Sequence, residues 1–305
     1  MSRLDLDIAD EPRAFDPTAP LTPSGNLRRR MIVSSIVQRS ATAAAVLAVV
    51  VLGIVVWSVF KNGADALSID FLTKDMPQFG GNEGGIGPAI VGTAEVVGIA
   101  TAIAMPLGIL IALFLTEFAS PRIGGVIRLV LDLINGLPSI VIAVFIFGLL
   151  VAGHHGSAMA AAIALAIIEL PLIARGSQEV LLLVPNNLRE AADALGVSKR
   201  RSVLGVILPA ATGGILTSTV LAVARAAGET APVLILNSIF NNHLHVNPLE
   251  QIATIPVLIF QLSEQPDPAG YARAWGAGFV LLTFILVANL AGRMALARSR
   301  SKLTK

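Results

Sequence analysis

Cysteine is absent from the 305-residue sequence, which excludes disulfides, thiolate metal ligands and cysteine nucleophiles. Charged residues are scarce, at 14% against the roughly 25% of globular chains. Hydrophobic residues reach 54% and the mean hydropathy is +0.77, so only lipid can hide this much apolar surface from water. This composition excludes a nucleic-acid-binding domain, a disordered chain and a collagen-like fibre. The net charge of only +2 implies no general polyanion-binding surface.

Several catalytic and nucleotide-binding motifs are also missing. No lysine follows a glycine, so the chain has no phosphate-cradling Gly-Lys-Ser/Thr loop and cannot be a nucleotide-hydrolysing subunit. It also lacks a His-Glu-x-x-His metal helix and a Gly-x-Ser-x-Gly elbow. The four histidines form two pairs, His154 with His155 and His243 with His245, which we expect to be ordinary solvated side chains. We therefore expect no enzymatic activity, no catalytic residues, no metal site and no cofactor.

Long apolar segments predict an all-α polytopic membrane protein. A helix needs about 20 apolar residues to cross a bilayer core of about 30 Å, and helices satisfy their backbone polar groups internally. Six segments meet this requirement: 41–60, about 89–115, about 129–152, 158–174, 209–237 and about 275–296. The apolar patch 255–260 is too short to cross, and we expect it to be interfacial or re-entrant. The sequence thus predicts six transmembrane helices.

The distribution of basic residues predicts the orientation. Lysine and arginine concentrate in cytoplasmic loops. With the N-terminus inside, eighteen of the 22 Lys and Arg residues lie on the inner side, three lie on the outer side, and Arg225 falls within a span. We therefore expect a multi-pass membrane protein with both termini cytoplasmic.

The same pattern divides the chain. Residues 1–40 form a cytoplasmic tail, whose Asp- and Pro-rich first 27 residues have no apolar periodicity and suggest a solvated extension. Residues 41–60 form the first span, which we expect to be a retained anchor because it begins late and follows several arginines. The main body, 84–297, holds the other five spans and a long loop over 176–208. Residues 298–305 form a second cytoplasmic tail.

The loop over 176–208 carries a helical pattern. Asn186 or Asn187 can cap a helix that continues through a run of helix-favouring residues, and Gly196 can end it in a left-handed turn. Ser198 can cap the next short helix, and Pro209 is expected to open the following span. An alanine-rich helix between two spans lets a partner protein approach closely. A helix resting on lipid headgroups would instead need a broad, bulky apolar face.

This loop resembles the EAA loop of type I ABC importer permeases. The shared pattern is Glu190-Ala191-Ala192, three residues, Gly196, nine residues, and then Val206-Ile207-Leu208-Pro209. The one departure is Val206, where the family usually has Ile. The resemblance implies the type I importer transmembrane fold and a coupling helix seated in a groove of a cytoplasmic ATPase. It assigns ATPase coupling to these residues of the loop: Glu190, Ala191, Ala192, Gly196, Leu208 and Pro209.

A larger part of the chain, roughly 84–295, is similar to phosphate-specific permeases of the PstA type. The stretches that carry this resemblance are Gly84 to Thr93, Leu170 to Arg175 leading to Glu179, Arg225 to Pro232, and Pro266 to Pro268. The resemblance implies a permease subunit that forms half of a pathway for inorganic phosphate. The implied partners are a PstC-type second permease, two ATPase subunits and an extracytoplasmic phosphate-binding protein.

Two charged residues inside the fifth predicted span form a candidate substrate site. Arg225 lies sixteen residues after Pro209, which is about 24 Å along a helix, deep in the bilayer. An arginine at such depth must face a pore or a partner. Glu229 follows four residues later on the same helix face. The pair could simply neutralise itself, or Arg225 could bind a tetrahedral oxyanion through two parallel hydrogen bonds. Gly228 and Pro232 could loosen the helix beside it.

Other ionisable residues receive weaker predictions. Arg175 ends the fourth span and is either a snorkelling anchor or, by the family resemblance, an exit-side anion contact. Glu95, Asp132 and Glu169 lie within or beside spans, and the sequence does not indicate their partners. Three alternatives to the phosphate permease remain open: a permease for sulfate or molybdate, an ion-coupled secondary carrier or channel, and a membrane-embedded hydrolase.

Overall fold

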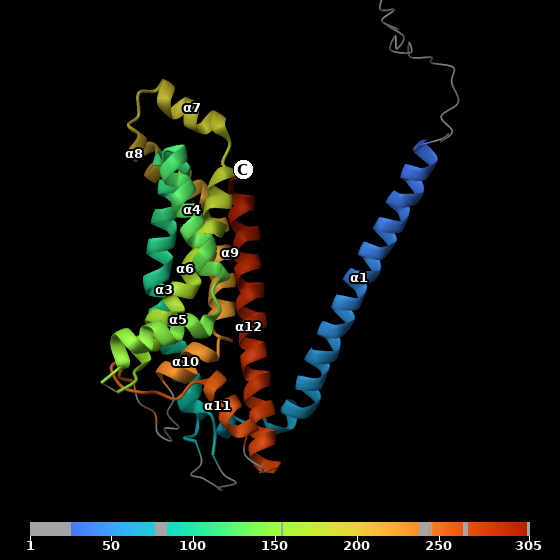
Figure 1. Cartoon of the computed structure of the whole chain (residues 1–305), viewed down its shortest axis with the longest axis vertical. Helices are drawn as coiled ribbons and strands as arrows, with labels where there is room; N and C mark the ends of the chain where they lie inside the picture. The colour runs from blue at the N-terminus through green and yellow to red at the C-terminus, as the bar shows by residue number, and fades with distance from the viewer. Residues whose placement is uncertain are drawn as a thin grey trace, which may run out of the picture. The chain divides into compact units, whose positions relative to one another are not determined.

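A computed structural model describes residues 26–76, 84–153, 155–237, 244, 246–264 and 268–303. Every regular element among them is a helix, which confirms the all-α prediction (Figure 1). The chain divides into two compact units, Met1–Val56 and Trp57–Lys305, and each is described by itself. The tail before residue 26 lies outside the described residues, as do His154, His243, His245 and the last two residues.

Helix α1 (Asn26–Gly63) supplies the described part of the first unit and ends in the second. It begins fifteen residues before the span predicted at 41–60, because no proline or glycine interrupts the polar stretch that precedes this span. None of its most apolar 18-residue window is buried. A helix that is apolar and uncovered in this way is suited to lipid rather than water.

The described part of the second unit is a bundle of helices. In chain order they are α2 (Ile69–Thr73), α3 (Gly87–Leu113), α4 (Pro121–Gly136), α5 (Ser139–Ile146), α6 (Ala158–Leu182), α7 (Asn186–Ala194), α8 (Lys199–Ser202), α9 (Leu208–Ala226), α10 (Ala231–Leu236), α11 (Ile255–Ser263) and α12 (Pro268–Leu303). Four short segments follow directly after a helix. The 3₁₀ segment η1 (Ala64–Ala66) follows α1, and three π segments follow α3, α5 and α8: η2 (Phe114–Phe118), η3 (Phe147–Val151) and η4 (Val203–Ile207).

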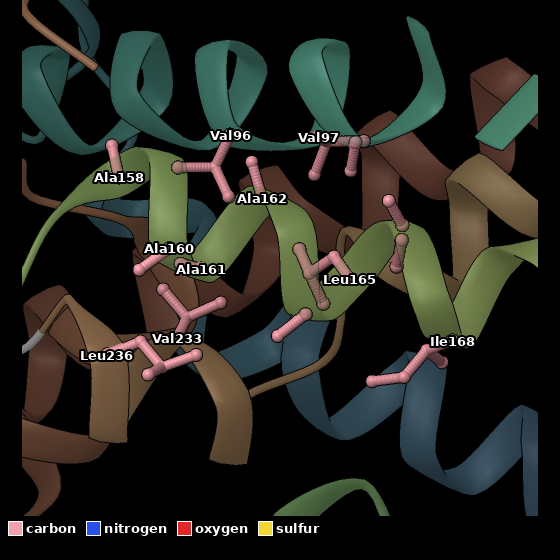
Figure 2. Packing of buried hydrophobic residues seen from close by; sticks show 14 of the residues in the cluster. Val96, Val97, Ala158, Ala160, Ala161, Ala162, Leu165, Ile168, Val233 and Leu236 are labelled. Atoms are coloured by element: carbon pink, nitrogen blue, oxygen red, sulfur yellow. The ribbon is translucent and has the colours of Figure 1, made fainter. Parts of the chain in front are cut away.

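Helix α6 is the centre of the bundle. Its small side chains, including Ala158, Ala161 and Ala162, are buried against α3 on one side and α10 on the other (Figure 2). Small residues let helix backbones approach closely, which is how membrane helices pack without a hydrophobic driving force. A side chain at Gly108 of α3 would meet Ile173 of α6 at 2.9 Å, so glycine is needed at this crossing.

The membrane-spanning helices match the predicted number with one change of shape. Five helical segments of the described chain are long and apolar enough to cross a membrane, and a sixth span results if α4 and α5 count as one. The prediction of a plain span over 129–152 needs correction, because α4 and α5 are bent by 97° at this point. Pro138 forces Leu137 into an extended conformation, with ψ 137°, and this ends α4.

Leu208 and Pro209 begin α9, as the sequence predicts, but the apolar segment extends further back through η4 and α8. The helix runs without a break from Lys199 to Ala226. The π segment η4 accommodates the proline, because the N–H of Leu208 bonds to the carbonyl of Val203 five residues earlier. The short helix α11 agrees with the prediction that 255–260 is too short to cross, and its first N–H donates to Oγ1 of Thr93 on α3 at 2.8 Å.

Candidate functional site

A break between α9 and α10 positions the two charged residues predicted to form a site. Helix α9 ends at Ala226, one residue after Arg225, and the chain turns through Gly228 before α10 begins. The N–H of Gly228 bonds to the carbonyl of Arg225 at 3.0 Å, which closes the turn. Glycine is a poor helix former, and Pro232 is accommodated in the first turn of α10. The predicted loosening of the helix at this point is confirmed.

A second break faces the first and completes a small polar pocket, called here the Arg225 pocket. Its volume is about 190 Å³, some six times the roughly 30 Å³ that a water molecule occupies in the liquid. The lining residues come from the α4–α5 break, from α6 and from the α9–α10 turn: Ile134, Asn135, Leu137, Pro138, Ser139, Ile142, Ile168, Arg225 and Glu229. Two helix interruptions thus bring polar groups into an apolar bundle.

Arg225 and Glu229 form a loose ion pair in this pocket. Nε of Arg225 lies 3.6 Å from Oε1 of Glu229, and the side chains are 53% and 19% exposed. The structure therefore brings the two predicted residues together and leaves the guanidinium open to the pocket. Asn135 and Ser139 were missed by the sequence analysis, although they flank the Gly136-Leu137-Pro138 interruption of an otherwise apolar segment.

Arg175 does not line the Arg225 pocket. It forms an ion pair with Asp132 of α4, and its Nη2 also donates to the carbonyl of Arg128 at 3.1 Å. Arg175 follows Ile168 by seven residues on α6, or about 10 Å along the helix, and so lies between the pocket and the α7 end of the bundle. The structure thereby identifies the partner that the sequence could not assign to Asp132.

The other two unassigned acids lie outside the pocket lining. Glu169 is fully buried on α6 and accepts a hydrogen bond from Oγ1 of Thr101 on α3 at 3.1 Å. Glu95 is half-buried on α3. Among the described residues, no group of three or more His, Asp or Glu side chains gathers closely enough to hold a metal ion.

Helix α7 presents the residues of the EAA pattern at one end of the bundle (Figure 1). Glu190 and Ala191 are exposed, whereas Ala192 is buried. The predicted left-handed turn at Gly196 is confirmed, with φ +67°. The N–H of Gly196 bonds to the carbonyl of Asp193, and that of Val197 bonds to the carbonyl of Ala192, which is the Schellman arrangement that ends a helix.

The predicted caps of this loop differ from the structure. The residue before α7 is Pro185, so neither Asn186 nor Asn187 caps the helix. Oδ1 of Asn186 instead accepts a hydrogen bond from Arg189 at 3.1 Å. Ser198 occupies the N-cap position of α8 as predicted, but its side chain makes no capping hydrogen bond. Leu195, next to Gly196, is 81% exposed and adds an apolar side chain to this surface.

Arg189 is a further residue that the sequence analysis missed. Its Nε bonds to Oε1 of Glu117 in η2 at 3.1 Å, and this ion pair is largely buried. The two Nη atoms donate to the carbonyls of Val184 at 2.6 Å and Leu181 at 2.8 Å. No local pattern could have found this contact, because Glu117 and Arg189 lie 72 residues apart in the sequence.

Comparisons with known proteins agree with this architecture. Residues 104–301 match the family described as binding-protein-dependent transport system inner membrane component. The fold is similar to a chain of a bacterial alginate ABC transporter solved with an alginate-bound periplasmic protein, with TM-score 0.57 and 16% identity over 88% of this chain and 94% of the other. It is also similar to a chain of the inward-facing MetNI methionine ABC transporter, with TM-score 0.55 and 17% identity over 70% and 94% of the two chains.

Relatives found by sequence have higher identity to this chain than these two solved structures. The phosphate transport system permease protein PstA 1 of Mycobacterium tuberculosis H37Rv is 36% identical over 95% of this chain and 94% of its own length. The phosphate transport system permease protein PstA of Haemophilus influenzae is 37% identical over 79% and 85% of the two chains. The family match over residues 104–301 includes the α7–α8 loop and the Arg225 pocket. The chain therefore belongs to the inner membrane components of binding-protein-dependent transport systems and, within them, to the PstA-type permeases.

Proposed function

We propose that this chain is the permease subunit of an ATP-driven importer of inorganic phosphate. The observation that carries the proposal is the Arg225 pocket, where a half-exposed guanidinium faces a small polar cavity inside a membrane domain. A guanidinium offers two parallel donors that fit a tetrahedral oxyanion, and such charge-assisted bonds are strong where little water competes. The phosphate permease names of the relatives support the same substrate.

Glu229 can make the site selective for a protonated oxyanion. Its carboxylate lies beside the guanidinium that would hold the anion. Phosphate retains a proton near neutral pH and can donate a hydrogen bond to this carboxylate. Sulfate has no proton to donate and would meet a negative charge without compensation. A carboxylate next to the binding arginine therefore favours phosphate over sulfate.

Arg175 is a second contact on the pathway in this proposal. It lies between the pocket and the α7 end and is held by Asp132. A phosphate that leaves Arg225 can compete with Asp132 for Arg175, because both are anions and the pair is partly exposed. We place this contact on the exit side of the pathway.

We further propose that the α7 end and both termini are cytoplasmic, as the positive-inside distribution predicts. The exposed Glu190 and Ala191, with Gly196 ending the helix, would then form a coupling surface for a cytoplasmic ATPase. Leu208 and Pro209 are the first two residues of α9, which α8 and η4 connect to this surface. ATP-driven closure of two ATPase subunits would move the coupling helices as rigid bodies.

The remaining partners follow from the incomplete pathway. The Arg225 side chain is half exposed in the single chain, so a second permease subunit is needed to close the cavity around the anion. We infer a heterodimer with a PstC-type subunit and delivery of phosphate by an extracytoplasmic binding protein. The chain itself contributes no catalytic step, and ATP hydrolysis belongs to its partners.

Uptake of labelled phosphate by reconstituted assemblies tests this proposal, with sulfate, molybdate and arsenate as competitors. We expect phosphate uptake to require ATP, the binding protein and the ATPase subunits. Of the three competitors, only arsenate, the closest chemical analogue of phosphate, should inhibit this uptake strongly. Glu190→Ala should abolish uptake while the permease pair still assembles. Uptake of sulfate in preference to phosphate would establish the other-oxyanion permease. Sustained phosphate transport without nucleotide would establish a secondary carrier.

A further inference from the structure

The Arg189 side chain joins three helical segments at the α7 end of the bundle. It belongs to α7, its Nε contacts Glu117 in η2, and its Nη atoms bond to the carbonyls of Leu181, in the last turn of α6, and of Val184, two residues after α6 ends. The last carbonyls of a helix have no partner within the helix and carry partial negative charge. Arg189 therefore satisfies the end of α6 and the Glu117 carboxylate with a single cation.

Glu117 depends on this contact. Its side chain is only 7% exposed, in the π segment η2 that ends the α3 span. A buried carboxylate is costly unless a cation or several hydrogen bonds accompany it. The π segment turns this residue toward α7, because the N–H of Ala119 bonds to the carbonyl of Phe114 five residues earlier. The π segment after α3 thus places the Glu117 carboxylate beside the Arg189 guanidinium of α7.

The adjacent residue of η2 holds the other part of the same loop. Nζ of Lys199, the first residue of α8, lies 5.3 Å from the ring centroid of Phe118, within the range of a cation–π interaction. Arg189 and Lys199 therefore attach both short helices of the loop to two consecutive residues, Glu117 and Phe118. The end of α3 is the common attachment point.

Helix α7 also contacts α8 and η4, but little of it is buried. Ala192 is its one buried residue, and Glu190 and Ala191 face outward. Arg189 is the α7 side chain that bonds to η2 and to the end of α6, so it offers a direct route by which a displacement of α7 reaches α3 and α6. These two helices pack tightly against each other, and α6 also carries Ile168 of the Arg225 pocket and Arg175. The path from α7 to the pocket is a continuous series of contacts.

From these contacts we propose that Arg189 is a positioning residue that transmits the movement of α7 to α3 and α6 through Glu117 and through the carbonyls at and just after the end of α6. This inference rests on the proposed function, because it assigns α7 to an ATPase. It makes Arg189, rather than the exposed Glu190, the residue that links the ATPase-facing helix to the membrane helices.

The test measures how many phosphate ions the reconstituted assembly transports per ATP hydrolysed. Arg189→Gln keeps a polar side chain that can donate hydrogen bonds but shortens it and removes its charge. We expect the transport ratio to fall by about tenfold, within the usual range of coupling between linked sites, while the ATPase subunits still co-purify and hydrolyse ATP. Arg189→Lys keeps the charge but loses the forked geometry, so its ratio should be intermediate.

The double variant Arg189→Gln with Glu117→Gln distinguishes a shared contact from two separate effects. If both residues act through one link, the double variant should be no worse than the poorer single variant. Additive losses would overturn the proposal. Arg200→Gln is the matched control, because Arg200 is an exposed arginine of the same loop, and its ratio should equal that of the unchanged chain.

Two outcomes separate this inference from the proposed function. If the unchanged assembly does not couple ATP to phosphate uptake, the proposed function fails before any variant is compared. If it does, and Arg189→Gln keeps the full ratio, only the role of Arg189 is refuted. If Arg189→Gln does not assemble, Arg189→Lys and Glu117→Gln decide the question, and full ratios in both would refute the inference.

Discussion

The described part of the chain contains two arginine–glutamate pairs that differ in sequence separation, distance and burial. Arg225 and Glu229 are four residues apart, lie 3.6 Å from each other at a helix break, and leave about half of the arginine side chain exposed. Arg189 and Glu117 are 72 residues apart, lie at 3.1 Å, and are 21% and 7% exposed. Arg189 also bonds to carbonyl groups, whereas Glu229 is the one ion partner found for Arg225 among the described residues.

The difference shows what each pair can do. An arginine whose three nitrogen atoms all donate hydrogen bonds is a structural link, because another anion would have to displace several bonds at once. An arginine with one loose neighbour keeps donors available for a passing anion. The same two residue types therefore suit a fixed attachment in one place and reversible binding in the other. Burial and the number of bonds, rather than residue identity, make the distinction.

Substitution of Arg225 should have the largest effect on phosphate uptake and tests whether the open pair binds the anion. We expect Arg225→Ala to lower phosphate uptake by roughly a thousandfold, as expected when one side of a desolvated charge pair is removed. Arg225→Lys should lower phosphate uptake by roughly tenfold or more, because an ammonium group lacks the two parallel donors of a guanidinium. Uptake by reconstituted assemblies is the measurement. A wild-type rate in Arg225→Lys would show that the forked geometry is unimportant.

The stabilities of Arg189→Ala and Arg225→Ala test whether only the buried pair holds the structure together. Arg189→Ala leaves the buried Glu117 carboxylate without its cation, which should destabilise the protein by about 3 kcal/mol. Arg225→Ala should cost less than about 1 kcal/mol in the absence of substrate, because its pair is exposed and local. Thermal unfolding of the purified chain in one detergent compares the two. Equal shifts in Tm would contradict the distinction.

Glu229→Gln should have a smaller effect, confined to selectivity. The amide removes the negative charge that disfavours a fully deprotonated anion. We expect competition by sulfate to strengthen about tenfold, corresponding to one lost charge interaction of about 1.4 kcal/mol. Inhibition of labelled phosphate uptake by added sulfate measures this. Unchanged competition would remove Glu229 from the selectivity step.

Gly196→Ala should have the smallest effect. The added Cβ would meet open space, but φ +67° is unfavourable for any residue with a Cβ, by about 1 kcal/mol. We expect weaker co-purification of the ATPase, because the end of α7 shifts. Gly205→Ala is the matched control, since its Cβ also meets open space and its backbone is helical. Equal co-purification of the ATPase with Gly196→Ala and with Gly205→Ala would exclude a conformational role for Gly196.

Local sequence signals were sufficient for some features of the site. Arg225 and Glu229 could be predicted to meet, because four residues of helix place them on one face. The helix end at Gly196 could also be predicted, since only glycine adopts the left-handed turn at little cost. The caps were less predictable. Asn186 is a good capping residue, yet Arg189 binds its side chain and Pro185 precedes the helix.

Features that depend on distant contacts could not be predicted. The 97° bend at Pro138 has a local cause, but only the packed bundle turns that bend toward Arg225 to form a pocket. The Asp132 partner of Arg175 lies 43 residues away, and hydropathy gives no indication of which helices are neighbours.

Composition alone predicts that this protein lies in a membrane with up to six apolar spans, and the period of one helix predicts that Arg225 and Glu229 lie on the same face. The fold of the whole chain is what gives Arg189 partners at all three of its nitrogen atoms and leaves Arg225 half exposed. That outcome depends on where helices from distant parts of the chain come together, because a side chain's burial and hydrogen-bond partners are set by its neighbours in space.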